Sequence, residues 1–468
     1  MNAIVIVTDS LRVDHIGCYG SEVQTPNLDK FAQAGALFEH AYADSLPTIP
    51  MRTTWWTGTV GFPYRHWRPF EPSDYLLAEI LWDRGFTSAL ITDTYHMHKP
   101  VYNCGRGFDT VVWVRGQEYD PWIVDPEVRV DLGPHHRLRG DETDVVWRPR
   151  FEQYLRNRTM FRTEEEYPAP QVAIEAIRWL DYVVKDKGQK DNLFLWVDFF
   201  DPHEPWDPPE PYWSLYDPAY HGQEIIDPVP GDIEGYMTPE EVAHTRALYA
   251  GEVTFVDHWV GVLLDHVRAL GLFDNSLIMH TSDHGEPFGE HGFIRKAHDW
   301  NFEELVHIPW LIRHPEGIGA GQRFGQIVQS QDLMPTVLDF LGIAGPLELP
   351  FSAPGRTPFP QDVVVDRKAV TLDGTSLLPL MAGEVEAIRD YAYTGHGHRG
   401  HLWSIRSHDW SYLLPIRGEN PELYDRRTDP SEQSNVIHDH PELGEHLELE
   451  LRRFVDSLLA RHSGERLS

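Results

Sequence analysis

Four short apolar segments constrain the fold of this chain more than any other feature. They are continuous, rich in β-branched residues, and span residues 4–8, 87–92, 193–197 and 277–281. Continuous apolar runs separated by helical patterns are typical of buried parallel strands, whereas half-exposed strands alternate apolar and polar residues. The sequence therefore predicts an α/β fold with a large mixed, mostly parallel central sheet flanked by helices.

Each of these runs ends in side chains that can bind metal or transfer protons. In chain order they are Asp9; then Asp93, Thr94 and His96; then Asp198, Asp201 and His203; and finally Asp283 and His284. Open α/β sheets bind ligands beyond the carboxyl ends of their strands. We therefore expect the four sets of side chains to meet at one edge of the sheet.

Helix start and stop signals lie between the predicted strands. They predict helices over residues 25–35, 73–85, 238–271 and 330–342. The third begins with Thr238-Pro239 and has Glu241 three residues after Thr238, which is a capping-box pattern. Helices that alternate with the predicted strands in this way support the α/β interpretation.

The sequence changes character near residue 345. Residues 345–361 are rich in Pro and Gly, which indicates a linker. Short strand-like runs and a final helical segment follow, at residues 391–394, 403–405 and 441–461. We therefore predict a catalytic α/β domain (1–345), a linker (346–365) and a smaller C-terminal α+β domain (366–468).

Two long segments, residues 117–167 and 204–236, lack a sustained period. Both are dense in Trp, Pro, Asp and Arg. Long irregular segments in a compact enzyme are usually lids or binding walls. They can also be contacts in a homo-oligomer, and the sequence leaves both roles open.

Net charge limits the partners of the chain. A formal charge of -33 repels nucleic acid and anionic membrane surfaces, so neither is expected as a partner. A small anionic substrate would have to be attracted by a local cluster of cations and metal.

Cysteine usage and hydropathy bear on the compartment. Cys18 and Cys104 are too few for a disulfide framework, so we expect reduced thiols. There is no run of about 18 apolar residues to predict a membrane span, and the apolar run after Met1 is too short for a signal peptide. We therefore expect a soluble, cytoplasmic protein.

A hydroxyl and an arginine stand close together in Thr48-Ile49-Pro50-Met51-Arg52. With acid and imidazole side chains elsewhere, this favours metal-assisted attack on a tetrahedral anion. The motif resembles the sulfatase family of the alkaline phosphatase superfamily, whose members carry Cys or Ser followed by x-Pro-x-Arg here. Other motifs similar to the family follow in order along nearly the whole chain, at residues 9–14, 17–20, 25–29, 201–203, 249–253, 282–286, 332–336 and 422–425.

The nucleophile position departs from the family pattern. Family enzymes oxidise the Cys or Ser to formylglycine, and threonine is not a known substrate for that conversion. A formylglycine hydrate can eject sulfate by breaking its own C–O bond, and Thr48 has no such route. The resemblance and this departure together point to phosphorus rather than sulfate.

The resemblance implies one divalent metal ion, held by Asp9, Thr48, Asp283 and His284. Carboxylates with an imidazole suit Mn2+ best, with Zn2+, Fe2+ or Ca2+ as alternatives. Many sulfatases have Asp where Ser10 stands and Asn where His284 stands. Both departures resemble the phosphonate monoester hydrolase and phosphodiesterase branch more closely.

A second metal ion stays open, although one is favoured. Relatives with two metal ions need a further Asp and two His. The candidates in this chain are Asp198, Asp201, His203, His291, His298 and His396.

The resemblance also assigns catalytic roles. Thr48 would attack phosphorus in line, and Arg52 would brace the alkoxide and a nonbridging oxygen. His203 would act as general acid on the leaving group, and Lys296 as a cation touching the substrate.

Three further residues, Thr94, His96 and His298, would bind the substrate. Sulfatases commonly have the motif Lys-x-His at the position of Thr94-Tyr95-His96, so Thr94 replaces the lysine of that motif. The missing positive charge favours a singly charged ester over a phosphate monoester.

These inferences predict a metal-dependent hydrolase of phosphodiesters or phosphonate monoesters that forms a covalent phospho-threonine intermediate. Two alternatives stay open. One is a sulfuric ester hydrolase (a sulfatase) acting without formylglycine. The other is a phosphotransferase or a catalytically silent anion-binding relative.

Overall fold

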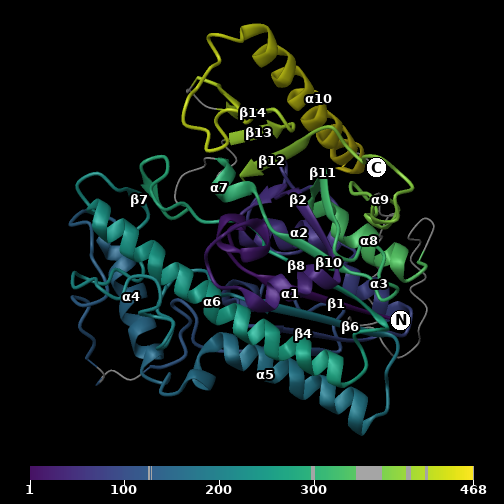
Figure 1. The fold of residues 1–468 in the computed structure, drawn as a ribbon, viewed down its shortest axis with the longest axis horizontal. Helices are drawn as coiled ribbons and strands as arrows, with labels where there is room; N and C mark the ends of the chain where they lie inside the picture. Colours follow the sequence, from purple (N-terminus) through teal and green to yellow (C-terminus); the bar gives the residue numbers. More distant parts are fainter. Residues whose placement is uncertain are drawn as a thin grey trace.

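A large sheet forms the centre of the molecule, as Figure 1 shows. The structure is a computed structural model and describes residues 1–124, 127, 129–296, 301–343, 372–396, 402–416 and 420–466. Among these, the strands stand in the order β11 (Arg323–Gln329), β2 (Ala36–Tyr42), β10 (Trp310–Arg313), β8 (Ser276–Thr281), β1 (Asn2–Thr8), β6 (Leu193–Phe199), β4 (Thr87–Thr92) and β5 (Thr110–Trp113). β10 is antiparallel to its neighbours and the other pairs are parallel. The predicted mixed, mostly parallel sheet is confirmed.

The four apolar runs of the sequence are β1, β4, β6 and β8, and they stand next to one another in the sheet. Every residue of β1, β6 and β8 is buried. Burial on both faces explains why these strands are continuously apolar. Because the four strands are parallel neighbours, their carboxyl ends lie at the same edge.

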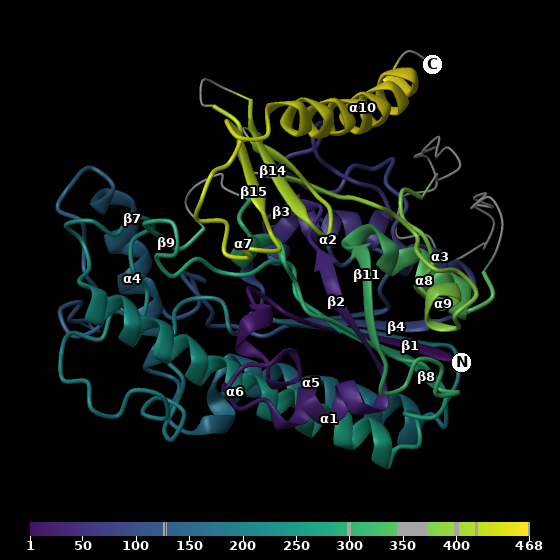
Figure 2. The same cartoon turned by 45° about the horizontal axis from the view of Figure 1, so that its top comes forward.

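Helices cover both faces of the sheet, as Figure 2 shows. Ile4 and Ile6 of β1 pack with α1 (Pro26–Ala34), α5 (Pro168–Asp181) and α6 (Pro239–Ala269). Val5 and Val7 point the other way and pack with α2 (Thr48–Thr57), α3 (Leu77–Asp83) and α8 (Leu333–Phe340). The alternation of β1 side chains therefore joins two cores through one sheet.

The helix predictions hold with two differences. α1 and α6 match, and Thr238 caps α6 as expected. The segment 73–85 is helical only from Leu77, because Glu79 accepts a hydrogen bond from the Leu76 backbone N–H and so fixes the start there. The segment 330–342 divides into a 3-10 turn (Ser330–Asp332) and α8.

The insertion at 117–167 contains a helix that the sequence did not predict. This helix, α4 (Asp144–Arg158), has Pro149 inside it and buries only Phe151, Tyr154, Leu155 and Asn157. Its first turns are exposed, so no apolar face repeats along its full length. The insertion at 204–236 is irregular except for β7 (Gly231–Asp232), which pairs with β9 (Phe293–Ile294).

A smaller sheet domain lies at the C-terminal side. Its strands stand in the order β15 (Glu422–Asp425), β14 (Trp410–Pro415), β13 (Leu402–Arg406), β12 (Ala392–His396) and β3 (Ser45–Leu46). The helix α10 (Pro441–Arg466) packs on this sheet. Two short helices, α7 (Glu303–Val306) and α9 (Leu378–Met381), come before strand β12 in the chain. The predicted linker, 346–365, lies outside the described residues, so the domain boundaries stay predictions.

β3 ties this smaller sheet to the N-terminal part of the chain. It ends two residues before Thr48 and pairs in parallel with β12, Ser45 opposite Gly395 and Leu46 opposite His396. The C-terminal sheet therefore supports the segment that leads into α2.

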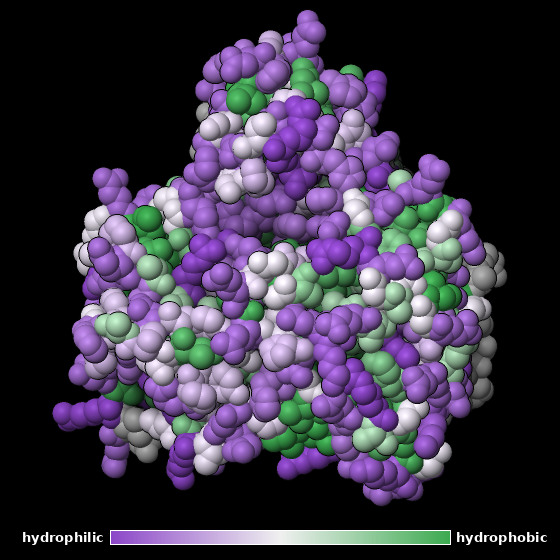
Figure 3. Space-filling model, viewed as in Figure 1, coloured by the Kyte–Doolittle hydropathy of each residue, from purple (hydrophilic) through white to green (hydrophobic). Residues whose placement is uncertain are grey.

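One face of the molecule is drawn by hydropathy in Figure 3. The face in Figure 3 is mostly hydrophilic, with small scattered apolar patches. Among the described helices, none has both the length and the apolar character needed to cross a membrane. Cys18 and Cys104 are free thiols.

Candidate active site

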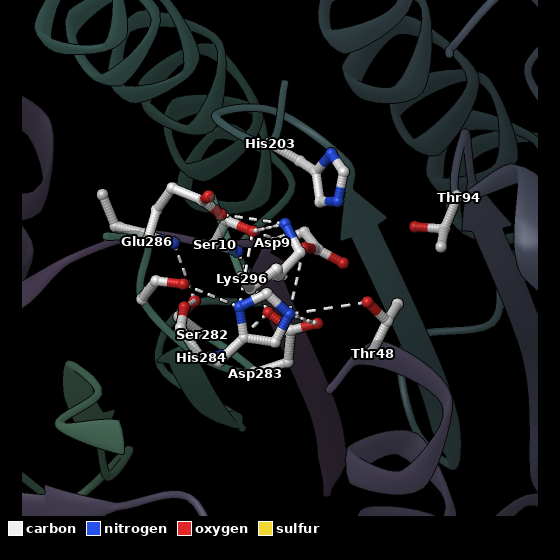
Figure 4. Close-up of polar contacts among 12 residues, drawn as sticks. Asp9, Ser10, Thr48, Thr94, His203, Ser282, Asp283, His284, Glu286 and Lys296 are labelled. Atoms are coloured by element: carbon white, nitrogen blue, oxygen red, sulfur yellow. Dashed lines mark hydrogen bonds and ion pairs between the residues drawn. The ribbon is translucent and has the colours of Figure 1, made fainter. Parts of the chain in front are cut away.

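Asp9, Asp283 and His284 come together beyond the ends of β1 and β8, as Figure 4 shows. Their ligand atoms lie within 4.8 Å of one another, and all three side chains are buried. His284 Nε2 lies 3.6 Å from Asp283 Oδ2 and 3.9 Å from Asp9 Oδ1. We call these three residues the metal group. Two carboxylates and an imidazole form a donor set suited to a divalent cation.

Thr48 lies beside the metal group. It is the first residue of α2, and its Oγ1 is 3.5 Å from His284 Nε2. Its side chain does not cap the helix. Pro50 is in the first turn, so the helix N-terminus, which favours negative charge, is close to the hydroxyl.

The hydrogen bonding of His284 sets its tautomer. Nδ1 donates to the Gly285 carbonyl oxygen at 2.8 Å, so in the neutral ring Nε2 carries a lone pair toward Thr48 and Asp283. Burial lowers the pKa of His284 to about 4. The ring is therefore neutral near pH 7, which is the state that binds a metal ion.

The carboxylates of the metal group repel each other. Burial and the Asp283 carboxylate raise the pKa of Asp9 well above its usual value. Burial acts on Asp283 too, but His284 and Arg52 hold the pKa of Asp283 below its usual range. A further positive charge would let both carboxyls ionise, so these residues fit a cation.

Arg52 is fully buried and donates all five of its N–H groups to protein oxygens. Nε and Nη2 bind Asp198 at 3.0 and 2.6 Å, and Nη2 also binds Asp9 at 3.0 Å. Nη1 binds Asp283 at 2.6 Å and the Thr48 carbonyl oxygen at 3.1 Å. The predicted contacts of Arg52 with the alkoxide and a nonbridging oxygen stay a prediction.

Lys296 joins the metal group to a second set of acids. Its Nζ lies 3.3 Å from Ser10 Oγ, 2.9 Å from Glu286 Oε2 and 3.1 Å from Glu204 Oε2.

Ser10 has a φ of 61°, a strained value for a residue with a side chain. That turn directs the Ser10 N–H to Asp283 Oδ1 at 3.0 Å.

Glu118, His203 and Glu204 form the second group of possible ligands, again with atoms within 4.8 Å of one another. We call them the lysine group, because Lys296 contacts Glu204. Arg295 also contacts Glu204. Since two cations already offset Glu204, this group is a weaker candidate for a metal ion than the metal group.

His203 is buried, and its Nδ1 donates to the Glu204 carbonyl oxygen at 2.8 Å. Burial, with Lys296 and Arg295 nearby, lowers the pKa of His203 well below its usual value. In the neutral ring Nε2 therefore carries no proton. The predicted general-acid role of His203 stays a prediction, and this tautomer suits a base.

Thr94 and His96 already have protein partners. Thr94 Oγ1 donates to Asp198 Oδ1 at 3.0 Å. His96 Nε2 lies 3.0 Å from Glu118 Oε2, and Lys99 Nζ is 3.5 Å from His96 Nδ1. Their predicted role in substrate binding stays a prediction. His298 lies outside the described residues.

The remaining candidates for a second metal ion are also engaged. Asp201 accepts from Gln117, and His291 contacts Glu304 and the Glu432 carbonyl oxygen. His396 lies at the end of β12, opposite Leu46. None of them joins the two groups of possible ligands found among the described residues.

Sequence reasoning missed Glu118, Glu204 and Arg295. Glu204 directly follows His203 in the sequence, so proximity was a usable signal. Glu118 and Arg295 have φ values of 44° and 62°, and no local pattern predicts such backbone turns at Glu and Arg.

Both insertions contribute side chains to this region. Glu118 and Trp147 come from 117–167, and Glu204 and Asp227 from 204–236. Arg295 lies 2.5 Å from Asp227 Oδ1, and its guanidinium carbon is 5.1 Å from the centre of the Trp147 ring. The insertions therefore form a wall beside the site, while contacts between copies of the chain stay a prediction.

The chain is similar to known proteins over most of its length. An arylsulfatase of Clostridium perfringens is 23% identical over 499 aligned positions, which cover 99% of this chain and 95% of that protein. Two solved phosphonate monoester hydrolases share the fold. The enzyme of Agrobacterium radiobacter has a TM-score of 0.71 at 23% identity, covering 98% of this chain and 96% of its own. That of Silicibacter pomeroyi has a TM-score of 0.72 at 20% identity, covering 98% and 95%. Residues 1–343 match the family model described as Sulfatase, and the chain belongs to the sulfatase family.

Proposed function

We propose that this sulfatase-family hydrolase of ester bonds cleaves phosphodiesters or phosphonate monoesters through a covalent phospho-threonine at Thr48. One observation carries the proposal: a threonine hydroxyl, which cannot become formylglycine, stands at the nucleophile position 3.5 Å from His284 Nε2. A hydroxyl beside buried carboxylates and an imidazole, at a helix N-terminus, is arranged for attack on a tetrahedral anion.

Sulfatase-family enzymes use a divalent metal, and we propose that the metal group and Thr48 hold one such ion here. Mn2+ matches this donor set best, with Zn2+, Fe2+ or Ca2+ as alternatives. When bound, such an ion lowers the pKa of a neighbouring hydroxyl and offsets negative charge in the transition state.

The covalent chemistry belongs to Thr48. Its Oγ1 loses its proton and forms a bond to phosphorus while the bond from phosphorus to the alcohol oxygen breaks, and the departing oxygen takes up one proton, so one proton is released and one is consumed. Water then bonds to phosphorus as the bond to Oγ1 breaks, and one proton lost by the water is matched by the proton that Oγ1 regains, which restores the threonine. Neither step needs an oxidant or a reductant.

Lys296 and His203 suit the leaving-group side in this scheme. Lys296 is a cation held between Glu204 and Glu286, so it can offset charge on the departing oxygen. His203 has its proton on Nδ1, so its Nε2 can accept a proton from the attacking water in the second step.

The charge of the site supports a singly charged substrate. All five N–H groups of Arg52 donate hydrogen bonds to protein oxygens. Thr94 occupies the position at which many sulfatases have a lysine. Fewer cations face the ester than a doubly charged phosphate monoester needs. We therefore propose diesters and phosphonate monoesters, which carry a single charge.

Assays with four aryl esters of one leaving group test this proposal. The four are a phosphodiester, a phosphonate monoester, a phosphate monoester and a sulfate. We expect the first two to turn over fastest, and the intact mass of the Thr48 peptide after rapid quenching to show an added phosphoryl group. Fastest turnover of the sulfate, with no adduct, would reject the proposal.

A sulfate-ester hydrolase is the second candidate, because an arylsulfatase is among the known proteins that this chain resembles in sequence. A Thr48→Cys variant, produced together with an enzyme that makes formylglycine, separates the two. If threonine restricts the chemistry to phosphorus, the matured variant gains sulfate turnover that the natural chain lacks. Equal sulfate turnover by both proteins would favour the sulfatase.

A further inference from the structure

We propose that Asp198 is a positioning residue: it anchors Arg52 and so keeps the carboxylates of Asp9 and Asp283 available to a divalent cation. This inference rests on the metal site of the proposed function. It assigns to Asp198 a role through Arg52, in place of the role of ligand to a second metal ion.

Asp198 binds Arg52 more extensively than any other residue does. Both carboxylate oxygens take part, Oδ2 with Nε at 3.0 Å and Oδ1 with Nη2 at 2.6 Å. Such two-point pairing is the strongest arrangement between a guanidinium and a carboxylate. Asp198 is not one of the three residues of the metal group.

Two further contacts hold Asp198 itself in place. Thr94 Oγ1 donates to Oδ1 at 3.0 Å, and Trp196 Nε1 donates to Oδ2 at 3.2 Å. Asp198 is fully buried and lies in the sheet, opposite Val7 of β1 and Thr92 of β4. The carboxylate is therefore fixed by two neighbouring strand ends as well as by Arg52.

Arg52 competes with a cation for the metal group. Its Nη2 reaches Asp9 Oδ2 at 3.0 Å and its Nη1 reaches Asp283 Oδ2 at 2.6 Å. A guanidinium without its two-point partner would lean further onto these two carboxylates. Asp198 limits that shift, so the metal group can bind a cation without displacing Arg52 from the site.

Charge counting leads to the same conclusion. When a divalent cation is bound and Asp9 is ionised, the carboxylates of Asp9, Asp198 and Asp283 against the Arg52 guanidinium carry a formal charge of -2, which the cation offsets. Replacing Asp198 with a neutral residue leaves -1, so the same cation would bring the buried cluster to +1. Burial makes such an excess unfavourable.

The test is Mn2+ affinity, measured by chelator competition on the metal-free protein without substrate. We expect Asp198→Asn to weaken Mn2+ binding about 10- to 100-fold, the usual range for partners of metal-site residues. Thr94→Val, which removes one bond to Asp198 and no charge, should weaken it less. As a matched control, Asp257→Asn removes a buried carboxylate that binds Asn27 and Leu28 rather than Arg52, and should leave Mn2+ affinity unchanged.

A double-mutant cycle shows whether Asp198 acts through Arg52. Arg52→Lys keeps the charge but cannot make the two-point pair, so Asp198→Asn should cost several-fold less affinity in that background. Equal losses in both backgrounds would overturn the proposal, as would unchanged affinity of the single variant. If the natural chain binds neither Mn2+ nor Zn2+, the metal site fails and this inference fails with it. If the natural chain hydrolyses the sulfate ester fastest, but the double-mutant cycle still shows that Asp198 and Arg52 are coupled in Mn2+ affinity, only the proposed function is contradicted.

Discussion

The metal group and the lysine group hold similar residues but differ in how their charge is offset. The two carboxylates of the metal group share one partner cation, Arg52, which is also bound to Asp198. In the lysine group, Glu204 alone contacts both Arg295 and Lys296. The two groups therefore differ in charge balance. The metal group is short of positive charge, whereas the lysine group already has enough positive charge from Arg295 and Lys296.

Within the proposed function, this difference suits the two groups to different parts of the reaction. A cluster short of positive charge suits a cation and, beside it, a nucleophile that becomes negatively charged. A neutralised cluster that already holds a lysine and an imidazole suits proton and charge transfer at the leaving group. Thr48 lies near the first, 3.5 Å from His284 Nε2.

The largest expected effect is that of Thr48→Ala. Removing the hydroxyl should lower kcat by about four orders of magnitude or more, because the covalent route is lost. The fold should stay intact, since the side chain caps no helix. Steady-state kinetics with an aryl phosphodiester and a thermal melt check both points. Full activity of the alanine variant would reject Thr48 as nucleophile, and Thr48→Ser, which keeps a hydroxyl, is the matched control.

Matched neutral substitutions in the two groups test the comparison directly. Asp9→Asn should weaken Mn2+ binding by at least about 100-fold, because it removes a carboxylate of the metal group. Glu118→Gln, in the lysine group, should leave Mn2+ affinity within a few-fold of the natural chain. Isothermal titration of the metal-free variants measures both. A strong effect of Glu118→Gln, with none of Asp9→Asn, would reverse the assignment.

The metal group was predictable from sequence for a physical reason. Asp9 and Asp283 follow continuous apolar runs, and any parallel sheet brings such strand ends to one edge. β1 and β8 are adjacent, so the two carboxylates meet, as do their neighbours His284 and Ser10. Local patterns and one rule of sheet architecture predicted that these side chains meet, whereas their role as metal ligands was implied by the family resemblance.

The lysine group was not predictable in the same way. Glu118 lies in an irregular insertion, and Gln117 positions it by donating to Asp93 and Asp201, at the ends of two different strands. Those bonds depend on tertiary structure, which no local pattern records. Arg52 was predicted in part. The sequence predicted that it belongs to the site, but its two hydrogen bonds to the Asp198 carboxylate depend on the distance between α2 and β6.

The next effect concerns Lys296. Lys296→Gln should slow cleavage of an alkyl ester about 10- to 100-fold, because a poor leaving group depends on a nearby cation. The same change should affect a 4-nitrophenyl ester much less, since nitrophenolate leaves readily. Comparing kcat/KM for the two esters measures the difference, and Lys296→Arg, which keeps the charge, should recover part of it. An equal loss with both esters would place Lys296 elsewhere than at the leaving group.

The smallest effect is on stability, and it concerns the anchor of the lysine group. Burial raises the pKa of Asp93 to about 7, and Gln117 links Asp93 to Asp201, whose pKa burial also raises. A carboxyl with a raised pKa in the folded state binds its proton more tightly there than in the unfolded chain, where its pKa is about 4. Between those values, the folded protein therefore loses stability as pH rises, by up to about 1.4 kcal/mol per pH unit for one group.

Asp93→Asn tests this linkage by removing one titrating carboxyl while keeping an acceptor for Gln117. The free energy of unfolding, measured in urea between pH 5 and 7, should fall less steeply with pH in the variant than in the natural chain. Asp265→Asn, an exposed change on α6, serves as the control and should not alter the slope. Identical slopes for the natural chain and Asp93→Asn would mean that Asp93 is already ionised in the fold. The wall that carries Glu118 would then be anchored by an ionised Asp93, and a shortage of positive charge would extend from the metal group to the surroundings of the lysine group.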